Sequence, residues 1–195
     1  IPTSPYGYTK WLGEQIIGDL FISNNRLRMM SLRYFNPIGA HQSALIGELP
    51  VGKPNNLLPF ITQTAAGIHE KLVIFGKDYP TVDGTCVRDY IHVVDLAEAH
   101  VKAIDHLLSL KNGCHEVVNV GTGKGTSVLE LVHAFEEENN MKLNYTFGPK
   151  RSGDVIEIYA NVDYAHSLLG WKATRDINDG VRDAWKWEKS IRNIQ

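Results

Sequence analysis

Short apolar segments typical of buried strands alternate along this chain with longer segments whose apolar residues recur at helical spacing. The strand-like segments cover residues 27–35, 72–76, 90–93, 116–120 and 143–147. The helix-like segments cover residues 5–22, 60–71, 96–110, 127–138, 162–169 and 177–191. Because strands separated by helices pair in parallel, the alternation predicts an α/β fold.

Several helix starts carry capping signals. Ser4 is a good N-cap, and Pro5 suits the first helical position. Asp95 is expected to cap the helix that begins at residue 96. Thr126 or Ser127 is expected to cap the next predicted helix, which covers residues 127–138. The apolar residues of the first helix are amphipathic in spacing but spread over more than one face, so we expect burial on two sides.

The composition is that of a globular protein, and it excludes several kinds of partner. Of the 195 residues, 43% are hydrophobic and 22% are charged. A net charge of −2 offers no basic field for nucleic acid or acidic membranes. No apolar run approaches the ~18 residues of a membrane span, and no signal peptide is visible. Two cysteines, Cys86 and Cys114, suit a reducing compartment, so we predict a cytoplasmic protein.

Two long loops interrupt the alternation. Residues 36–59 are rich in Gly, Pro and Asn, and residues 77–88 contain Pro80 and Gly84. A structureless stretch of about two dozen residues in a compact domain indicates either a binding loop or disorder. The apolar residues within 36–59 argue against disorder, so we expect a binding loop there.

Tyr6 and Lys10 stand four residues apart and therefore share one face of the first helix. A phenol ordinarily ionises near pH ~10, but a fixed ammonium nearby stabilises the phenolate. Tyr6 could then accept and donate a proton. Chance alone produces roughly half an instance of this spacing in a chain of this composition, so the pair by itself is weak evidence for catalysis.

Residues 121–126, Gly-Thr-Gly-Lys-Gly-Thr, lie between a strand and a helix, where a phosphate-binding loop would lie. The glycine spacing fits neither the dinucleotide fingerprint nor the P-loop, so we predict a structural turn. The eight histidines show no metal-ligand spacing, and no metal site is predicted. His92 is expected to be a hydrogen-bonded interior residue.

Arg88 and Arg151 each lie in a polar loop beside a strand, and each has an aspartate nearby, Asp89 and Asp154 respectively. Two loop salt bridges would explain this arrangement. Guanidinium groups are also the usual bidentate partners of phosphate, and two of them converging on a Gly- and Asn-rich loop would suit a diphosphate. The residues alone leave both interpretations open.

Seven segments match one known family in the same order. They are Ser4-Pro5-Tyr6-Gly7 with Lys10, then 32–41 (LRYFNPIGAH), 54–59 (PNNLLP), 75–81 (FGKDYPT), 84–97 (GTCVRDYIHVVDLA), 119–123 (NVGTG) and 151–154 (RSGD). Over essentially its whole length, the chain resembles the UDP-glucose 4-epimerases (UDP-galactose 4-epimerases) of the extended short-chain dehydrogenase/reductase family.

The resemblance implies the C-terminal part of a Rossmann-like doubly wound parallel sheet plus a smaller mixed α/β substrate-binding domain. Residues 1–35 would be the last part of the NAD-binding domain. Residues 36–195 would be mainly the sugar-nucleotide-binding domain, with 88–110 returning to the Rossmann sheet. The family's glycine-rich loop and the Ser or Thr that partners the catalytic tyrosine would precede Tyr6. We therefore expect a piece of a longer protein that by itself binds NAD poorly and is inactive.

The resemblance also implies NAD-dependent interconversion of UDP-glucose and UDP-galactose, a step of galactose metabolism, through transient oxidation at C4 of the sugar. Tyr6 would be the acid/base, and Lys10 would hold the nicotinamide ribose. Tyr34 and Phe35 would lie close to the nicotinamide. The implied substrate contacts are Asn36 to the sugar, Asn56, Leu57, Arg88 and Arg151 to the diphosphate, Val73, Ile74 and Phe75 to the uracil, Asp154 to the ribose, and Ile158 to the sugar pocket.

The sequence leaves alternatives open for the substrate range and for the exact activity. At position 158 the family's tyrosine restricts the pocket to glucose and galactose, and a small residue admits N-acetylated sugars; Ile158 is intermediate. The resemblance implies a homodimer packed through the first helix. A sister activity, such as another sugar-nucleotide epimerase, a dehydratase or a decarboxylase, is one alternative. A non-catalytic sugar-nucleotide-binding module is another, although binding alone needs no proton-transfer group such as Tyr6.

Overall fold

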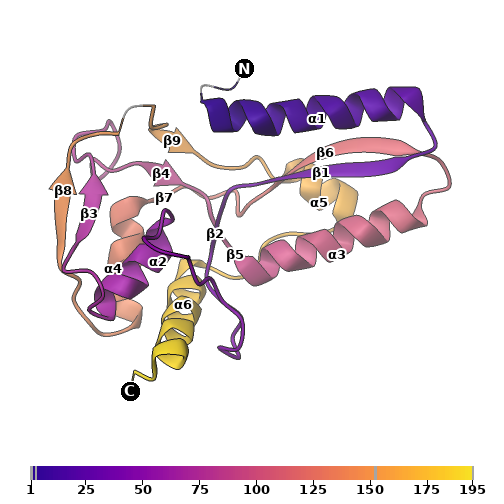
Figure 1. Ribbon diagram of the computed structural model, residues 1–195. Helices are drawn as coiled ribbons and strands as arrows, with labels where there is room; N and C mark the ends of the chain where they lie inside the picture. Colours follow the sequence, from indigo (N-terminus) through magenta and orange to yellow (C-terminus); the bar gives the residue numbers. More distant parts are fainter. Residues whose placement is uncertain (1, 3, 152, 195) are drawn as a thin grey trace.

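The computed structural model describes residues 2, 4–151 and 153–194, in which helices and strands alternate as an α/β fold (Figure 1). Strands pair in parallel as β1–β6, β2–β5, β3–β8 and β4–β9, and β4 also pairs antiparallel with β7. In chain order the elements are α1 Pro5–Ser23, β1 Arg28–Tyr34, β2 Asn36–Ile38, α2 Leu57–Ala65, β3 Leu72–Phe75, β4 Val87–Arg88, β5 Tyr90–His92, α3 Val93–Ser109, β6 Cys114–Val120, β7 Thr126–Ser127, α4 Val128–Glu138, β8 Tyr145–Gly148, β9 Glu157–Ile158, α5 Asp163–Leu169 and α6 Ile177–Arg192. The predicted fold class is therefore confirmed.

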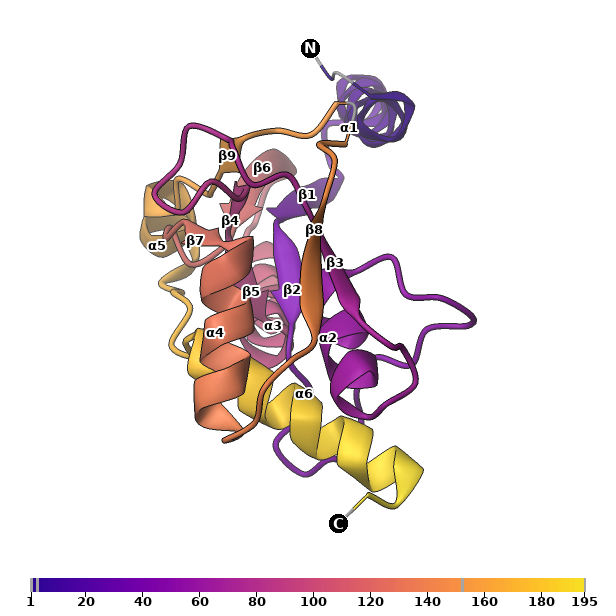
Figure 2. The same cartoon turned by 90° about the vertical axis from the view of Figure 1, so that its left-hand side faces the viewer.

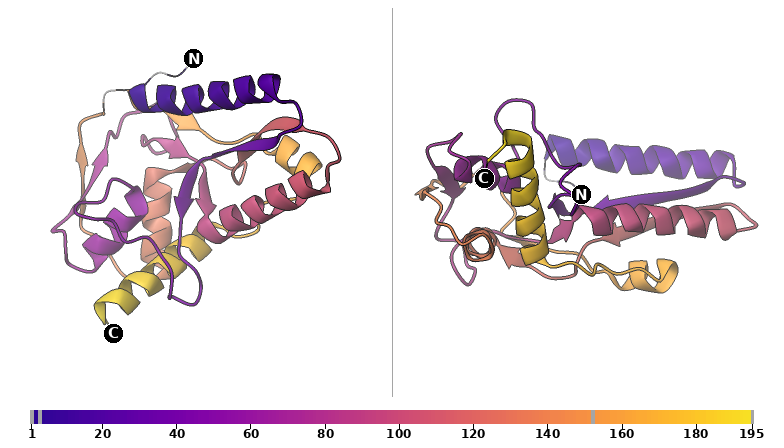
Figure 3. Two further views of the ribbon diagram at one scale, coloured as in Figure 1. Left: turned by 45° about the vertical axis from the view of Figure 1, so that its right-hand side comes forward. Right: turned by 90° about the horizontal axis from the view of Figure 1, so that it is seen from below.

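The longest strand pair has helices on both of its faces. Strands β1 and β6 run parallel over seven residues, from Arg28 opposite Cys114 to Tyr34 opposite Val120. Helix α1 lies along one face, and α3 and α5 lie on the other, as the views in Figures 1 and 3 agree. The apolar side chains between this strand pair, α3 and α5 form one core cluster: Ile91, Leu96, Ala99, Ala103, Val118, Val120, Ala165, Leu169 and Trp171.

A second core cluster fills the other half of the molecule. Helices α2, α4 and α6 pack together beside the β3–β8 and β2–β5 pairs (Figure 2). The fully buried members include Phe135, Ile61, Ile74, Leu131 and Val181. Strand β6 pairs with β1, and residues of α5 pack in the first cluster together with residues of α3.

Helix α1 begins as its sequence predicts. The Ser4 hydroxyl accepts a hydrogen bond from the Gly7 amide at 3.1 Å, and Pro5 occupies the first turn. No residue of α1 is buried in the described chain, so burial of this helix on two sides stays a prediction for the longer protein. Its apolar residues surround the helix, so no single face concentrates enough of them to be covered by one sheet.

The loop 36–59 contains more regular structure than its composition predicts. Asn36–Ile38 pairs with β5, and Pro37 is tolerated because this short strand has its partner on one side only. Helix α2 begins at Leu57 instead of residue 60, since Pro59 lies in the first turn, where its missing N–H costs nothing. It ends at Ala65 instead of residue 71, because Gly67 adopts a positive φ of 75°.

Helix α3 begins at Val93, so the prediction that Asp95 caps it is wrong. His92 is the N-cap, and its Nδ1 accepts from the Val94 amide at 3.1 Å. Asp95 is buried in the first turn of α3 and binds the segment before α6 instead, accepting from the amides of Thr174 and Arg175 at 3.1 and 2.9 Å. Because the Asp95 carboxylate binds residues far away in the sequence, capping rules that consider only neighbouring residues assign it the wrong role.

None of the helices in the described part of the chain is long and apolar enough to cross a bilayer.

Candidate functional site

Tyr6 and Lys10 lie one turn apart on the first part of α1. The Lys10 ammonium is 5.1 Å from the centre of the Tyr6 ring, so the two side chains lie together as the spacing predicts. The Tyr6 side chain is 72% exposed. Its hydroxyl is therefore open to a ligand, which is the accessibility that a proton-transfer group requires.

Tyr34, Phe35 and Asn36 follow one another where β1 ends and β2 begins. Tyr34 is exposed, and its ring lies 6.2 Å from the ring of His100 on α3. The Asn36 amide donates to the Asp89 carbonyl at 3.0 Å. That bond brings the exposed Asn36 next to the strand that carries Arg88, although more than fifty positions separate them in the sequence.

Arg88 forms an ion pair across two short strands. Its Nη2 lies 3.3 Å from Asp154 Oδ1, and Ile158 stands opposite Arg88 in the β4–β9 register. The partner of Arg88 is thus not the adjacent Asp89, since Asp154 comes from the loop before β9. A guanidinium held in this way keeps donors free for an anionic ligand.

A buried polar pair lies behind this ion pair. The Cys86 thiol is 4.0 Å from Asp154 Oδ2, and the buried Tyr79 hydroxyl has no hydrogen-bond partner among the described residues. Burial raises the pKa of Tyr79, and Cys86 and Asp154 act in the same direction. The raised pKa keeps the Tyr79 phenol protonated and uncharged near neutral pH.

Arg151 stacks on a side chain of β3, the strand that the resemblance assigns to the uracil. Its guanidinium carbon lies 3.9 Å from the centre of the Phe75 ring. Val73 and Phe75 are half-buried, whereas the Ile74 side chain packs in the core at 1% exposure. Ile74 could therefore take part in ligand binding only through its backbone.

Asn56 and Leu57 form the start of α2. Asn56 is the N-cap residue, but its side chain makes no capping bond. The side-chain amide donates instead to Glu48 Oε1 at 2.8 Å. The first amides of α2 are thus left without a side-chain cap, which suits an anionic group at this helix start.

The glycine turn at 121–126 is occupied by a carboxylate of the chain itself. Asp89 is fully buried and accepts from the Thr122 amide at 2.9 Å, the Gly123 amide at 3.0 Å and the Ala160 amide at 3.1 Å. The prediction of a structural turn is confirmed, because these amides are already satisfied by an anion. Ser127 caps α4 in a full capping box with Glu130, which selects Ser127 over Thr126.

Sequence reasoning missed the role of Asp89. A charged residue between two strand-forming segments is the available signal, because a buried carboxylate must find several donors. Adjacency suggests Arg88 as its partner, but adjacent residues of a strand point their side chains to opposite faces.

His92 is an interior residue, as predicted, but only one of its nitrogens is hydrogen-bonded. Its Nε2 lies 3.5 Å from Asp183 Oδ2 on α6 and makes no hydrogen bond within the described chain. Burial lowers the pKa of His92, and Asp183 opposes that shift. Within residues 2, 4–151 and 153–194, no group of three or more His, Cys, Asp or Glu side chains could hold a metal ion.

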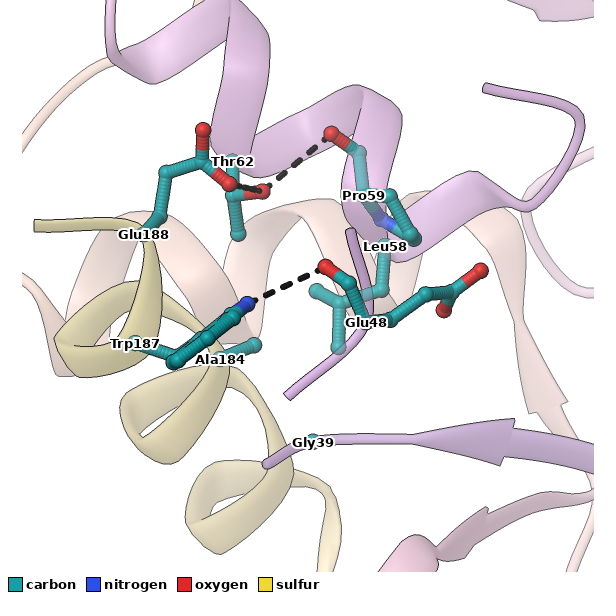
Figure 4. Close-up of a pocket in the computed structure, with 8 residues that line it drawn as sticks. All are labelled: Gly39, Glu48, Leu58, Pro59, Thr62, Ala184, Trp187 and Glu188. Atoms are coloured by element: carbon teal, nitrogen blue, oxygen red, sulfur yellow. Dashed lines mark hydrogen bonds between the residues drawn. The ribbon is translucent and has the colours of Figure 1, made fainter. Parts of the chain in front are cut away.

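The structure brings several of the predicted substrate residues together in pairs, and among the described residues no hydrogen bond or ion pair joins these pairs to Asn56 or Leu57. Main-chain pairing links Asn36 to the Arg88 strand, and side-chain contacts link Arg88 to Asp154 and Arg151 to Phe75. The small pocket drawn in Figure 4 lies elsewhere, between α2, α6 and the loop that contains Glu48.

Comparison with known proteins places this chain in a family. The family model described as GDP-mannose 4,6 dehydratase matches residues 1–184. The chain is 51% identical to a UDP-glucose 4-epimerase of Drosophila melanogaster over 98% of its own length and 55% of the relative. It is 49% identical to a UDP-glucose 4-epimerase of Bacillus subtilis over 96% of its length and 55% of the relative. The chain thus spans about half the length of these curated relatives.

Solved structures agree with the sequence comparison. A UDP-glucose 4-epimerase from Stenotrophomonas maltophila, crystallised with NAD and a formylated UDP-arabinopyranose, has a TM-score of 0.94 and 47% identity, over 100% of this chain and 57% of that one. A UDP-glucose 4-epimerase from Bifidobacterium longum, in complex with NAD+ and UDP, has a TM-score of 0.93 and 42% identity, over 99% and 57%. Given the shared fold and the family match, the chain belongs to the extended short-chain dehydrogenase/reductase family, in the group described by the GDP-mannose 4,6 dehydratase model.

Proposed function

We propose that the protein of which this chain is part is an NAD-dependent UDP-glucose 4-epimerase that interconverts UDP-glucose and UDP-galactose. One observation carries the proposal: the chain holds an exposed Tyr6–Lys10 pair on α1, an Arg88–Asp154 ion pair, and Arg151 stacked on Phe75. The Tyr6–Lys10 pair supplies proton transfer, and the arginines and Phe75 supply cationic and aromatic contacts for a nucleoside diphosphate. Relatives at about 50% identity carry the name of this activity.

NAD fits the residues at the α1 end of the site. Tyr6 and Tyr34 are exposed at 72% and 54%, and the Lys10 side chain is exposed as well, so their polar atoms can reach a ligand. With Phe35, these residues would hold the nicotinamide and its ribose. Bound NAD supplies reversible hydride exchange with C4 of the sugar.

The residues of this chain manage the proton and the position of the sugar. The Tyr6 phenolate takes the proton of the C4 hydroxyl, becoming the neutral phenol, and then returns that proton to the same oxygen. The Lys10 ammonium stabilises the phenolate before the first of these events and after the second. Asn36 contacts the sugar, while Arg88 and Arg151 bind the diphosphate with the start of α2 at Asn56 and Leu57.

The uridine would lie on β3 and the loop before β9. Val73 and Phe75 offer half-buried apolar surface to the uracil, with Ile74 contributing backbone, and Asp154 accepts from the ribose hydroxyls. Ile158 is 43% exposed opposite Arg88, where it borders the sugar pocket. We propose that its intermediate size admits both plain and N-acetylated UDP-sugars.

The domain division and the assembly belong to the same proposal. The β1–β6 pair with α1, α3 and α5 would form part of the NAD-binding domain, and the α2–α4–α6 cluster would form the UDP-sugar domain. Exposed apolar side chains around α1, among them Trp11, Leu12 and Ile16, would pack in a cytoplasmic homodimer.

Product analysis of the longest chain that the gene encodes, supplied with NAD and, in separate samples, UDP-galactose or UDP-glucuronate, tests the activity. Formation of UDP-glucose supports the epimerase. A 4-keto-6-deoxy product would establish a dehydratase, loss of CO2 from UDP-glucuronate would establish a decarboxylase, and UDP binding without any product would establish a binding module. We expect the 195-residue chain alone to show no turnover, because it spans only about half the length of the UDP-glucose 4-epimerases that it matches.

A further inference from the structure

The loop between β2 and α2 is fastened to the C-terminal helix α6 at two points. The Trp187 indole N–H donates to the Glu48 carbonyl at 3.1 Å, and the Lys186 ammonium donates to the Gln42 carbonyl at 2.6 Å. The Trp187 ring lies so close to Gly47 that a Cβ at that position would overlap it. Figure 4 shows the indole pointing at the Glu48 carbonyl from α6.

Glu48 reaches from this fastened point to the candidate substrate site. Its carboxylate accepts from the Asn56 side-chain amide at 2.8 Å. Asn56 is exposed, so without a partner its amide would rotate freely. An amide nitrogen carries two N–H donors, and the bond to Glu48 uses one of them. The second donor is then held in a fixed direction at the start of α2.

Helix α6 also holds the other side of Asn56. Glu188 is 2% exposed, and its Oε2 accepts from the Thr62 hydroxyl of α2 at 3.0 Å. Arg192 pairs with the same carboxylate one turn later on α6. Figure 4 shows this second attachment above the first. One helix therefore fixes both the loop before Asn56 and the helix after it.

We propose that Glu48 is a positioning residue for a nucleoside diphosphate, held in place by Trp187, and that it acts by orienting the Asn56 amide. The inference rests on the proposed function, since it assumes that Asn56 faces the diphosphate. The role requires a hydrogen-bond acceptor at position 48, and a negative charge there would repel a diphosphate. Glutamine keeps the acceptor and removes the charge, so the two contributions can be separated.

UDP titration by calorimetry tests the proposal on the longest chain that the gene encodes, loaded with NAD. Glu48→Ala should weaken UDP binding by about tenfold, and Glu48→Gln should bind within about twofold of the wild type. With UDP-galactose, Glu48→Ala should raise KM by a similar factor and leave kcat within about twofold, because the residue touches no reacting atom. Glu48 is exposed, so neither variant threatens the fold.

Trp187→Phe tests the attachment itself, because it keeps an aromatic ring and removes the N–H donor. Hydrogen exchange of the amides in 41–56 should become faster in this variant, and UDP binding should weaken by about threefold. Unchanged exchange would overturn the role assigned to Trp187.

The outcomes separate the inference from the proposed function. Wild-type affinity in Glu48→Ala overturns the inference and leaves the epimerase intact. Equal weakening in Glu48→Ala and Glu48→Gln also overturns it, because the carboxylate charge would then matter more than the acceptor. UDP binding with the expected difference but no epimerisation overturns the function and supports the inference. A wild-type protein that does not bind UDP overturns both.

Discussion

The two ends of the candidate site are held in opposite ways. Tyr6 and Lys10 stand on α1, which buries no residue and is tied to β1 by the Glu14–Arg33 ion pair. The hydrogen bond from Arg33 lowers the pKa of Glu14, so this tie persists at neutral pH. Phe75 on β3 and Asn56 at the start of α2, by contrast, belong to segments that contribute side chains to a dense apolar core.

This difference separates chemistry from stability within one site. A residue on α1 can change with little effect on folding, because few packing contacts depend on it. The segments that carry the other predicted substrate residues, such as β3 and α2, also contribute side chains to the apolar core. A substitution there can therefore change both ligand binding and folding. Substitutions at the two ends of the site should therefore have different effects on turnover, stability and binding, and the largest effect is expected at Tyr6.

Replacing Tyr6 by Phe should reduce kcat by about 10²–10⁴-fold, because the variant lacks the only proposed group that exchanges a proton with the C4 hydroxyl. The thermal midpoint and the UDP affinity should stay the same, since the exposed ring is retained. Turnover of UDP-galactose, a melting curve and a UDP titration make the comparison. A variant that keeps more than a tenth of the activity would remove Tyr6 as the acid/base.

Truncating Phe135 on α4 to alanine should destabilise the chain by about 3–5 kcal/mol, because it leaves a cavity in the larger core cluster. The matched change on α1, Leu20→Ala, should cost less than about 0.5 kcal/mol, since Leu20 is 49% exposed. Urea unfolding measures both. Equal costs would show that α1 is held as firmly as the core.

Arg88→Lys keeps the charge and removes the planar fork, so UDP affinity should fall about tenfold, equivalent to ~1.4 kcal/mol. Arg28→Lys is the matched control, because Arg28 donates to the carbonyls of Leu107 and Leu110 at the end of α3. Its UDP affinity should equal that of the wild type. If Arg88→Lys also binds normally, the diphosphate does not meet Arg88.

His92 should make stability depend on pH in the range just below neutrality. Burial lowers its folded-state pKa below the usual 6.5, with Arg175 acting in the same direction and Asp183 and Asp95 opposing it. Between the folded-state pKa and pH ~6.5, the unfolded chain therefore binds more protons than the folded chain. The contribution of His92 to the free energy of unfolding is fully present above pH ~6.5 and is lost as the pH falls through the folded-state pKa. The total loss in the free energy of unfolding grows with the difference between the folded-state and unfolded-state pKa values of His92.

Urea unfolding between pH 5 and 7 measures this effect. His92→Gln should flatten the profile, whereas the exposed control His166→Gln should keep the wild-type slope. The carboxylates with lowered pKa values, Glu14, Asp83, Glu136 and Asp179, lose their contribution only at lower pH, below their usual range. A slope that survives in His92→Gln would assign it to another group.

Local sequence determined the elements whose signals lie within one turn or one strand. Ser4, Pro5 and Ser127 start helices where capping chemistry places them. The apolar runs became strands, and the Tyr6–Lys10 spacing became a real contact. Each of these results depends on residues no more than about four positions apart, or on the burial of a whole apolar face.

Only the tertiary structure decided which polar groups became partners. Asp89 accepts hydrogen bonds from the amides of Thr122, Gly123 and Ala160 and does not pair with its neighbour Arg88. Asp95 binds the Arg175 amide instead of capping its own helix. The physical reason is that a buried carboxylate needs several donors at once, and a single local segment supplies too few. The same holds for Asn56, whose partner Glu48 has its backbone held by a tryptophan of the last helix.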